Sequence, residues 1–238
     1  MDFVEDFAIY YSVPLYALVV SAAYCIRACF RFDKAKVDNA LQYHNHAMIL
    51  ASCVLLCIAG DTYIDLARRA NTWDPNVIFF TEDRFQLSTR NRNIIIFQVC
   101  KVAEWIDTVF LILRRKPVIV LHWFHHGTIS MAFYVGSFTS SMLWIAIINS
   151  FIHIIMYAYY ARVAWLKPLA KYITQFQIVQ LGGSFVLNGY SLLYPMDHPK
   201  AYWASVLAFI IGCGYFGLFI YYYMTRYNRS GTSSKKIE

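Results

Sequence analysis

Residues 93–113 read NIIIFQVCKVAEWIDTVFLIL, a mostly apolar run near the middle of the chain. The hydrocarbon core of a bilayer takes about 20 apolar residues to cross as a helix. Backbone polar groups inside lipid are satisfied only in helices or closed barrels. The run therefore predicts a transmembrane helix. It also holds the charged residues Lys101, Glu104 and Asp107, and charge within a span marks a candidate functional site.

Further apolar runs extend on both sides of this segment. The chain is 59% hydrophobic and 15% charged, whereas soluble domains carry about 25% charged residues. These features predict an all-α polytopic membrane protein with seven transmembrane helices, formed by a single domain over 1–238 with a cytosolic tail at 227–238. The other six predicted spans are 8–30, 47–66, 118–138, 142–162, 168–193 and 202–225.

Basic residues gather at alternate ends of these spans, and this pattern predicts the orientation. The richer ends carry Arg27, Arg31, Lys34 and Lys36; Arg114, Arg115 and Lys116; Arg162, Lys167 and Lys171; and Arg226, Arg229, Lys235 and Lys236. Clusters of this kind face the cytosol, so we expect a lumenal N-terminus. Because the net charge of +7 lies in short clusters between spans, we expect no nucleic acid partner. Lys235 and Lys236 resemble a dilysine signal for retrieval to the endoplasmic reticulum.

Polar side chains recur at a similar depth in four of the predicted spans. Imidazoles at i, i+3 and i+4 share one face of a helix. Alignment of four helices on one layer predicts a single buried site, whereas each polar pair taken alone would fit ordinary helix packing. The residues are Lys101, Glu104, Asp107 and Thr108; His122, His125 and His126; Asn149, His153, Met156, Tyr157 and Tyr160; and Thr174, Gln177 and Gln180.

Four segments of this layer carry a family resemblance. KVAEWIDT (101–108), LHWFHH (121–126), HIIMYAYY (153–160) and TQFQIVQ (174–180) resemble, in order and spacing, four boxes of the ELO family of very-long-chain fatty acid elongases. Those boxes are KxxExxDT, HxxHH, HxxMYxYY and TxxQxxQ. The resemblance implies a seven-helix bundle in which six helices surround an acyl tunnel.

The same resemblance implies a 3-ketoacyl-CoA synthase. Such enzymes join a long-chain acyl-CoA to malonyl-CoA, release CO2 and CoA, and need no metal or redox cofactor. The implied partners are a 3-ketoacyl-CoA reductase, a 3-hydroxyacyl-CoA dehydratase and an enoyl-CoA reductase. Pro117 and Trp123 look more like members that act on saturated and monounsaturated chains. We expect side chains such as Tyr190 and Tyr194 to close the lumenal end of the tunnel.

The chemistry of the residues and the resemblance together predict roles within the layer. A neutral imidazole can attack a thioester and leave again, and in line with the resemblance we expect His125 to be this nucleophile. His153 would assist decarboxylation or stabilise the enolate. The supporting catalytic residues would orient the nucleophile, bind the thioester oxygen or fix tautomers, and they are His122, His126, Asp107 and Glu104. The predicted substrate-binding residues are Lys101, Asn149, Tyr157, Tyr160, Gln177, Gln180, Arg114 and Lys116, the last two placed for CoA phosphates together with Arg115 and Lys171.

Three alternatives stay open from the sequence alone. Cys100 is a competing nucleophile, although it lies deep for a CoA thioester. Membrane di-iron desaturases and hydroxylases also carry HxxHH, but they require about eight histidines and this chain has seven. A transporter could also hold a buried polar layer, with broken helices near Gly182 or Gly214.

Overall fold

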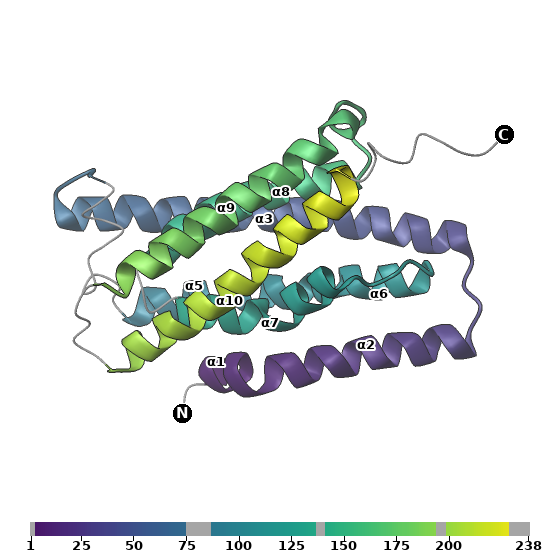
Figure 1. The fold of residues 1–238 in the computed structure, drawn as a ribbon, viewed down its shortest axis with the longest axis horizontal. Helices are drawn as coiled ribbons and strands as arrows, with labels where there is room; N and C mark the ends of the chain where they lie inside the picture. The colour runs from purple at the N-terminus through teal and green to yellow at the C-terminus, as the bar shows by residue number, and fades with distance from the viewer. Residues whose placement is uncertain (1–2, 75–86, 137–140, 194–198, 229–238) are drawn as a thin grey trace.

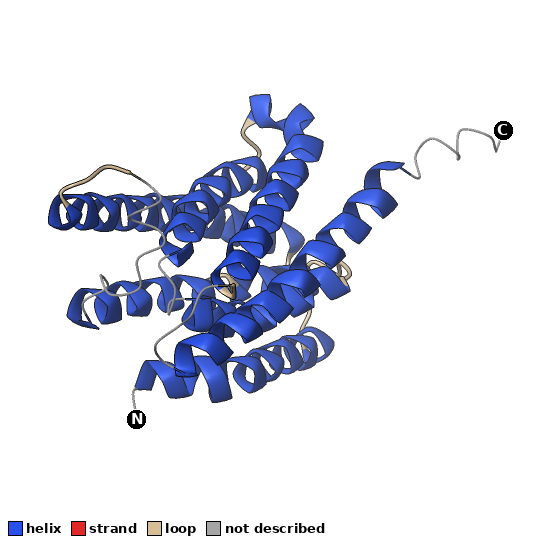
Figure 2. Ribbon diagram, turned by 60° about the vertical axis from the view of Figure 1, so that its left-hand side comes forward, coloured by secondary structure: helices blue, strands red, loops and turns tan. Residues whose placement is uncertain are grey.

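The computed structural model describes residues 3–74, 87–136, 141–193 and 199–228, and nearly all of these residues are helical (Figure 2). The helices run roughly along the longest axis of the molecule (Figure 1). In chain order the elements are α1 (Phe3–Asp6), η1 (Phe7–Tyr11), α2 (Ser12–Cys29), α3 (Lys34–Ala70), α5 (Leu87–Ala103), α6 (Trp105–Leu113), α7 (Val120–Gly136), α8 (Ser141–Tyr160), η3 (Ala164–Leu169), α9 (Ala170–Ser191), α10 (Pro199–Tyr223) and η4 (Met224–Asn228).

Within the described residues each of the seven predicted spans falls mostly on helix, so the all-α prediction is confirmed. Four helical segments of the described ranges are long and apolar enough to cross a membrane: Phe3–Cys29, Lys34–Arg69, Leu143–Tyr160 and Tyr202–Tyr227. The count of seven crossings stays a prediction.

Helix α3 begins 13 residues earlier than the predicted 47–66 span. The side chain of Asp33 accepts a hydrogen bond of 2.8 Å from the backbone N–H of Ala35, an N-cap that starts the helix at Lys34. With 37 residues the helix is about 55 Å long, more than the hydrocarbon core of a bilayer. The apolar run therefore marks only the middle of the helix.

The predicted 93–113 helix is divided at Glu104 into α5 and α6, so a single continuous helix was wrong. The N–H of Glu104 still bonds to the carbonyl of Cys100, at 3.1 Å. The N–H of Asp107 bonds instead to the carbonyl of Glu104, three residues back and also at 3.1 Å. A turn of this tighter kind locally resets the helix between the two carboxylates.

Six helical units pack in a closed ring, with α5 and α6 together counted as one unit. Going round the ring, α3 packs on α8, α8 on α9, α9 on α10, and α10 on α7. The ring closes where α7 packs on α5 and where both α5 and α6 contact α3. Helix α2 packs against α6 and α7 from outside this ring, along the lower edge of Figure 1. The ring matches the expected arrangement of six helices. An acyl tunnel within it stays a prediction.

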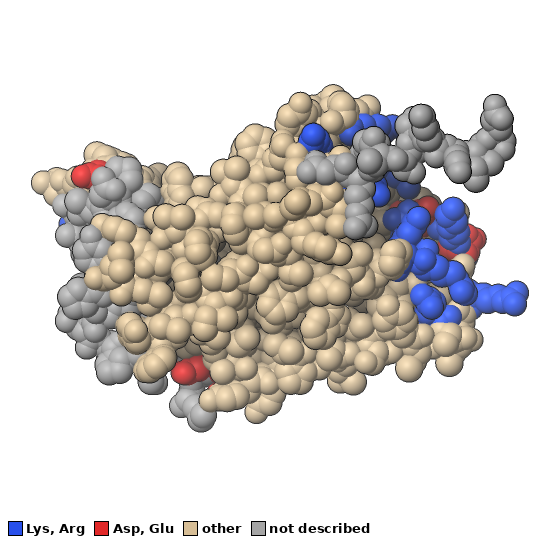
Figure 3. All heavy atoms as spheres, viewed as in Figure 1, with Lys and Arg blue, Asp and Glu red and all other residues tan. Residues whose placement is uncertain are grey.

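Positively charged side chains are concentrated at one end of the molecule. Lysine and arginine gather at the end where α2 meets α3, while the flanks show few charges (Figure 3). At that end Arg27 donates to the carbonyl of Ile112 at 3.5 Å, and Arg114 pairs with Asp38 at 2.8 Å. Arg162 also reaches Asp38, at 4.0 Å. Three of the predicted basic clusters therefore share one end, and Lys235 and Lys236 lie outside the described residues.

Candidate active site

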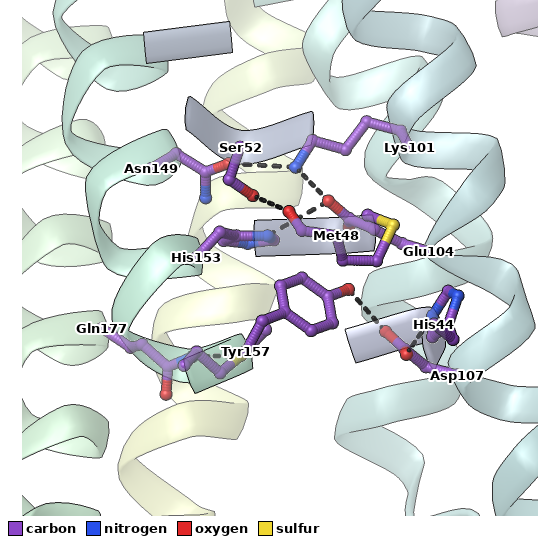
Figure 4. A network of polar contacts seen from close by, with 11 residues as sticks. His44, Met48, Ser52, Lys101, Glu104, Asp107, Asn149, His153, Tyr157 and Gln177 are labelled. Carbon is purple, nitrogen blue, oxygen red and sulfur yellow. Dashed lines mark hydrogen bonds and ion pairs between the residues drawn. The ribbon is translucent and has the colours of Figure 1, made fainter. Parts of the chain in front are cut away.

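The first part of the site is an ion pair buried between α5 and α8 (Figure 4). Lys101 Nζ lies 2.8 Å from Glu104 Oε1 and donates to Asn149 Oδ1 at 3.0 Å. His153 Nδ1 lies 3.1 Å from the same Glu104 oxygen. All of these groups except Asn149 are almost fully buried. The predicted neighbours Lys101, Glu104, Asn149 and His153 thus form one contiguous cluster.

Asp107 forms a second cluster, about one helical turn from Glu104 and nearer the basic end. Its Oδ2 accepts from the Tyr157 hydroxyl at 2.6 Å, and its Oδ1 lies 2.8 Å from His44 Nε2 (Figure 4). A carboxylate can only accept, so His44 must carry its proton on Nε2 here. The sequence interpretation assigned no role to His44. Its position in the N-terminal part of α3, before the predicted span, hid this contact.

Thr108 forms a third cluster that reaches helix α2. Its hydroxyl lies 2.9 Å from His122 Nε2 and 3.0 Å from the Tyr16 hydroxyl. Both Thr108 and Tyr16 are fully buried. Glu104, Asp107 and Thr108 were predicted to share one face, yet each meets a different partner. Tyr16 was missed because an aromatic residue in the first apolar run carries no signal that separates it from lipid-facing neighbours.

The three imidazoles of α7 pack against one another, tilted in one pair and edge-on in the other. The ring centroids of His122 and His126 are 4.2 Å apart, and those of His125 and His126 are 5.2 Å apart. His125 also packs against Tyr215 of α10, at 5.1 Å between centroids. The backbone carbonyl of His126 accepts from the Trp105 indole at 2.9 Å, which ties α7 to α6.

His125 packs against His126 in its own helix and against Tyr215 and Phe219 of α10. Within the described ranges no side chain hydrogen bonds to its imidazole, whereas His44, His122 and His153 each have a nitrogen engaged. His126 Nδ1 is likewise buried without a hydrogen-bond partner. Both of these imidazoles of the box therefore carry a ring nitrogen that no described group engages.

The remaining predicted residues lie at the edges of these clusters. Gln177 contacts the sulfur of Met156 at 3.5 Å, which joins α9 to α8. Tyr160 is 48% exposed and meets the buried Tyr157 edge-on, 6.3 Å between centroids. The carbonyl of Gln180 accepts from Ser184 in its own helix. The substrate-binding roles of Gln180 and Tyr160 stay predictions.

Two predicted cations lie at the basic end of the molecule. Arg114 is paired with Asp38, while Lys116 is exposed. Cys100, the alternative nucleophile, packs instead against an apolar cluster that includes Phe97 and Phe133. In the parts of the chain that the structure describes, no three His, Cys, Asp or Glu side chains converge as metal ligands would. Of the two residues expected at the tunnel end, Tyr194 lies outside those parts.

The sequence of this protein is similar to those of known proteins. The sequence profile of the GNS1/SUR4 family (ELO) matches residues 5–235. The chain is 44% identical over 92 residues to "Fatty acid elongase 3" of Trypanosoma cruzi, covering 36% of this chain and 31% of the relative. It is 31% identical over 151 residues to "Very long chain fatty acid elongase 5" of Rattus norvegicus, covering 57% and 48%. It is 30% identical over 152 residues to "Very long chain fatty acid elongase 3" of Homo sapiens, covering 59% and 55%.

These matches span from about a third to just over half of the length of the relatives. The family profile, in contrast, extends over nearly the whole chain and includes all four polar clusters. On that ground the chain belongs to the GNS1/SUR4 (ELO) family, whose named relatives are fatty acid elongases.

Proposed function

We propose that the protein is a 3-ketoacyl-CoA synthase, which condenses a long-chain acyl-CoA with malonyl-CoA. The products are a 3-ketoacyl-CoA two carbons longer, CO2 and CoA, with one proton taken up by the departing thiolate. The names of the relatives support the substrate class. The observation that carries the proposal is the imidazole of His125, which lies beside His126 in the histidine box and to which no described side chain hydrogen bonds.

The first step is acyl transfer to His125. A ring nitrogen attacks the thioester carbonyl, the carbon–sulfur bond breaks, and CoA leaves as a thiolate that is then protonated. An imidazole needs a free lone pair for this attack. His125 suits the role because no described side chain engages its nitrogens, whereas Thr108 occupies His122 and Glu104 occupies His153.

The second step is decarboxylative condensation. Malonyl-CoA loses CO2, and the freed electron pair forms a bond to the acyl carbonyl carbon as the bond to His125 breaks. Glu104 holds His153 through Nδ1 and stabilises a positive charge on that ring, so Nε2 can donate to the enolate oxygen. Lys101 balances the buried carboxylate, and Asn149 keeps Lys101 in place.

The setting follows from the same proposal. Seven helices cross the endoplasmic reticulum membrane, the basic end faces the cytosol where acyl-CoA and malonyl-CoA are dissolved, and the acyl chain lies in a tunnel within the six-helix ring. The exposed Lys116 at that end is placed for CoA phosphates.

No metal or redox cofactor takes part. Saturated or monounsaturated chains are the favoured substrates, and a ketoacyl-CoA reductase, a dehydratase and an enoyl-CoA reductase complete the cycle.

Purified protein in lipid nanodiscs tests the proposal with radiolabelled malonyl-CoA and a panel of saturated, monounsaturated and polyunsaturated acyl-CoAs. We expect labelled 3-ketoacyl-CoA that depends on both substrates, no product from His125→Ala, and product from Cys100→Ser. Both variants are checked for folding by their unfolding midpoints. Folded wild-type protein that yields no product with any acyl-CoA, or full activity in His125→Ala, contradicts the proposal.

A further inference from the structure

Helix α2 lies outside the ring of six helices, yet one of its side chains connects through Thr108 to the histidines of α7. The hydroxyl of Tyr16 lies 3.0 Å from Thr108 Oγ1, which lies 2.9 Å from His122 Nε2. Tyr16 and Thr108 are both fully buried, so bulk water does not reach either hydroxyl. These three groups form a chain of hydrogen bonds from α2 through α6 to α7.

The direction of this chain follows from the number of protons. The Thr108 hydroxyl has one proton and must donate it either to Tyr16 or to His122. If it donated to Tyr16, the phenol proton would be left without an acceptor, because Thr108 is its hydrogen-bond partner within the described segments. A buried donor left unpaired costs about 1–3 kcal/mol. Tyr16 therefore donates to Thr108, and Thr108 donates to His122 Nε2.

We propose that Tyr16 is a positioning residue of the site, which through Thr108 holds His122 in the neutral tautomer with its proton on Nδ1. Since Nε2 accepts, the Nδ1–H remains as the donor of this ring. The His122 ring packs at a tilt against that of His126, which in turn meets His125 edge-on. The tautomer follows from the hydrogen bonds alone, whereas its role in catalysis rests on the proposed function. In that role the Nδ1–H of His122 is a fixed donor to the thioester oxygen, and His122 does not act as a base.

The phenol ring is held tightly enough to fix this geometry. Its centroid lies 5.5 Å from that of Trp105, and the indole of Trp105 donates to the carbonyl of His126. On the other side the ring lies against Gly127, where an added Cβ would come within 3.1 Å of Tyr16 Cδ1. A glycine directly after the histidine box thus lets α2 approach α7. Helix α2 therefore also supports the site, because its Tyr16 packs against α7 and hydrogen bonds to Thr108.

Long-range 1H–15N correlation spectra of protein labelled with 15N-histidine test the inference without any assay of activity. Loss of signals in His122→Gln assigns the ring. We expect the Nδ1–H tautomer in wild-type protein, and a shift toward Nε2–H in Tyr16→Phe, which keeps the aromatic ring. Tyr24→Phe is the matched control, because Tyr24 lies on the same helix, is 41% exposed and stacks only its ring on Arg27. That control should leave the His122 signals in place.

An Nε2–H or doubly protonated His122 in wild-type protein overturns the inference, as does an unchanged tautomer in Tyr16→Phe. Where Tyr16→Phe does not fold, the wild-type spectrum and the Thr108→Val variant still decide the question. In the condensation assay we expect Tyr16→Phe to lower kcat about 10- to 100-fold with little change in KM, by analogy with metal-ligating histidines that lose their second hydrogen-bond partner. A wild-type protein without condensing activity would refute the proposed function alone, since the tautomer is measured separately.

Discussion

Lys101 and Glu104 carry opposite charges in a part of the protein that excludes water, each side chain being 2% exposed. A buried ion pair of this kind gains little net stability, because desolvation offsets the attraction. Removal of one partner is costly, however, because the other charge is left uncompensated. The role of the pair is therefore to hold two opposite charges in fixed positions at the site. Asn149 accepts a hydrogen bond from Lys101, and His153 contacts Glu104, so both help to fix those positions.

At the residue scale, we expect Lys101→Met to lower the free energy of unfolding by about 3–5 kcal/mol. The matched control is Arg69→Met. Arg69 pairs with Asp65 at 2.8 Å, but those side chains are 44% and 46% exposed, so the loss should be at most about 1 kcal/mol. Chemical unfolding in detergent micelles measures both. Equal small losses would show that the Lys101 charge is not buried.

His44 gives a second prediction at this scale. His44→Ala leaves the partly buried Asp107 Oδ1 without its donor, and we expect a loss of about 1 kcal/mol, the low end of the cost of an unpaired buried acceptor. The same carboxylate also accepts the hydrogen bond from the Tyr157 hydroxyl. Because Tyr157 is a predicted substrate-binding residue, a carboxylate that moves after loss of His44 should also lower condensing activity. His46→Ala is the control, because His46 is exposed and bonds to the carbonyl of Gln42 in its own helix, and it should change stability by less than about 0.5 kcal/mol. Identical behaviour of the two variants would remove His44 from the site.

At the scale of helices, α10 approaches α7 through a glycine. An added Cβ at Gly214 would lie 3.0 Å from Phe124 Cε1 and 3.3 Å from its Cζ, whereas Gly217 on the same helix has nothing within 4 Å. Phe124 directly precedes His125 in the box. The close approach at Gly214 thus helps to set where the predicted nucleophile lies relative to α10.

We expect Gly214→Ala to destabilise the protein by about 1–3 kcal/mol, because the Phe124 ring must move in a packed interface. Gly217→Ala should instead gain up to about 1 kcal/mol, since alanine favours helix over glycine and meets no neighbour. Comparison of their unfolding midpoints checks the pair. A gain of stability in both variants would mean that α7 and α10 pack more loosely than described.

At the scale of the whole molecule, α3 connects the two ends. Its start lies at the basic end, and its 37 residues exceed the thickness of a bilayer core, so both of its termini should reach water. Arg114 and Arg162 from other helices meet Asp38 near its start. The accumulation of positive charge there predicts which end faces the cytosol.

Single cysteines at the two ends of α3 test this orientation after the six native cysteines, all free thiols, are replaced by serine. In sealed microsomes a membrane-impermeant maleimide should label Ala35→Cys at once. It should label Trp73→Cys only after the membrane is permeabilised. Both positions are exposed in the structure. Labelling of both from outside would mean that α3 does not cross, and the reverse pattern would invert the topology.

Much of this architecture could be predicted from the sequence, because apolar runs about 20 residues long leave few alternatives to helices in a membrane. The buried histidines and carboxylates were also predictable, since charge within such runs is costly. The partners of those groups were not. His44 meets Asp107 across 63 positions, and Tyr16 meets Thr108 across 92. Periodicity within one helix cannot encode how two distant helices pack, nor the tighter turn at Glu104.

Transfer of the acyl group to His125 is the central step of the proposed mechanism. Purified protein mixed with a long-chain acyl-CoA, without malonyl-CoA, tests this transfer directly. We predict a burst of about one CoA per protein molecule, and an acyl adduct that peptide mass spectrometry locates on His125 and that His125→Ala lacks. An adduct on Cys100, or no release of CoA until malonyl-CoA is added, would contradict the account.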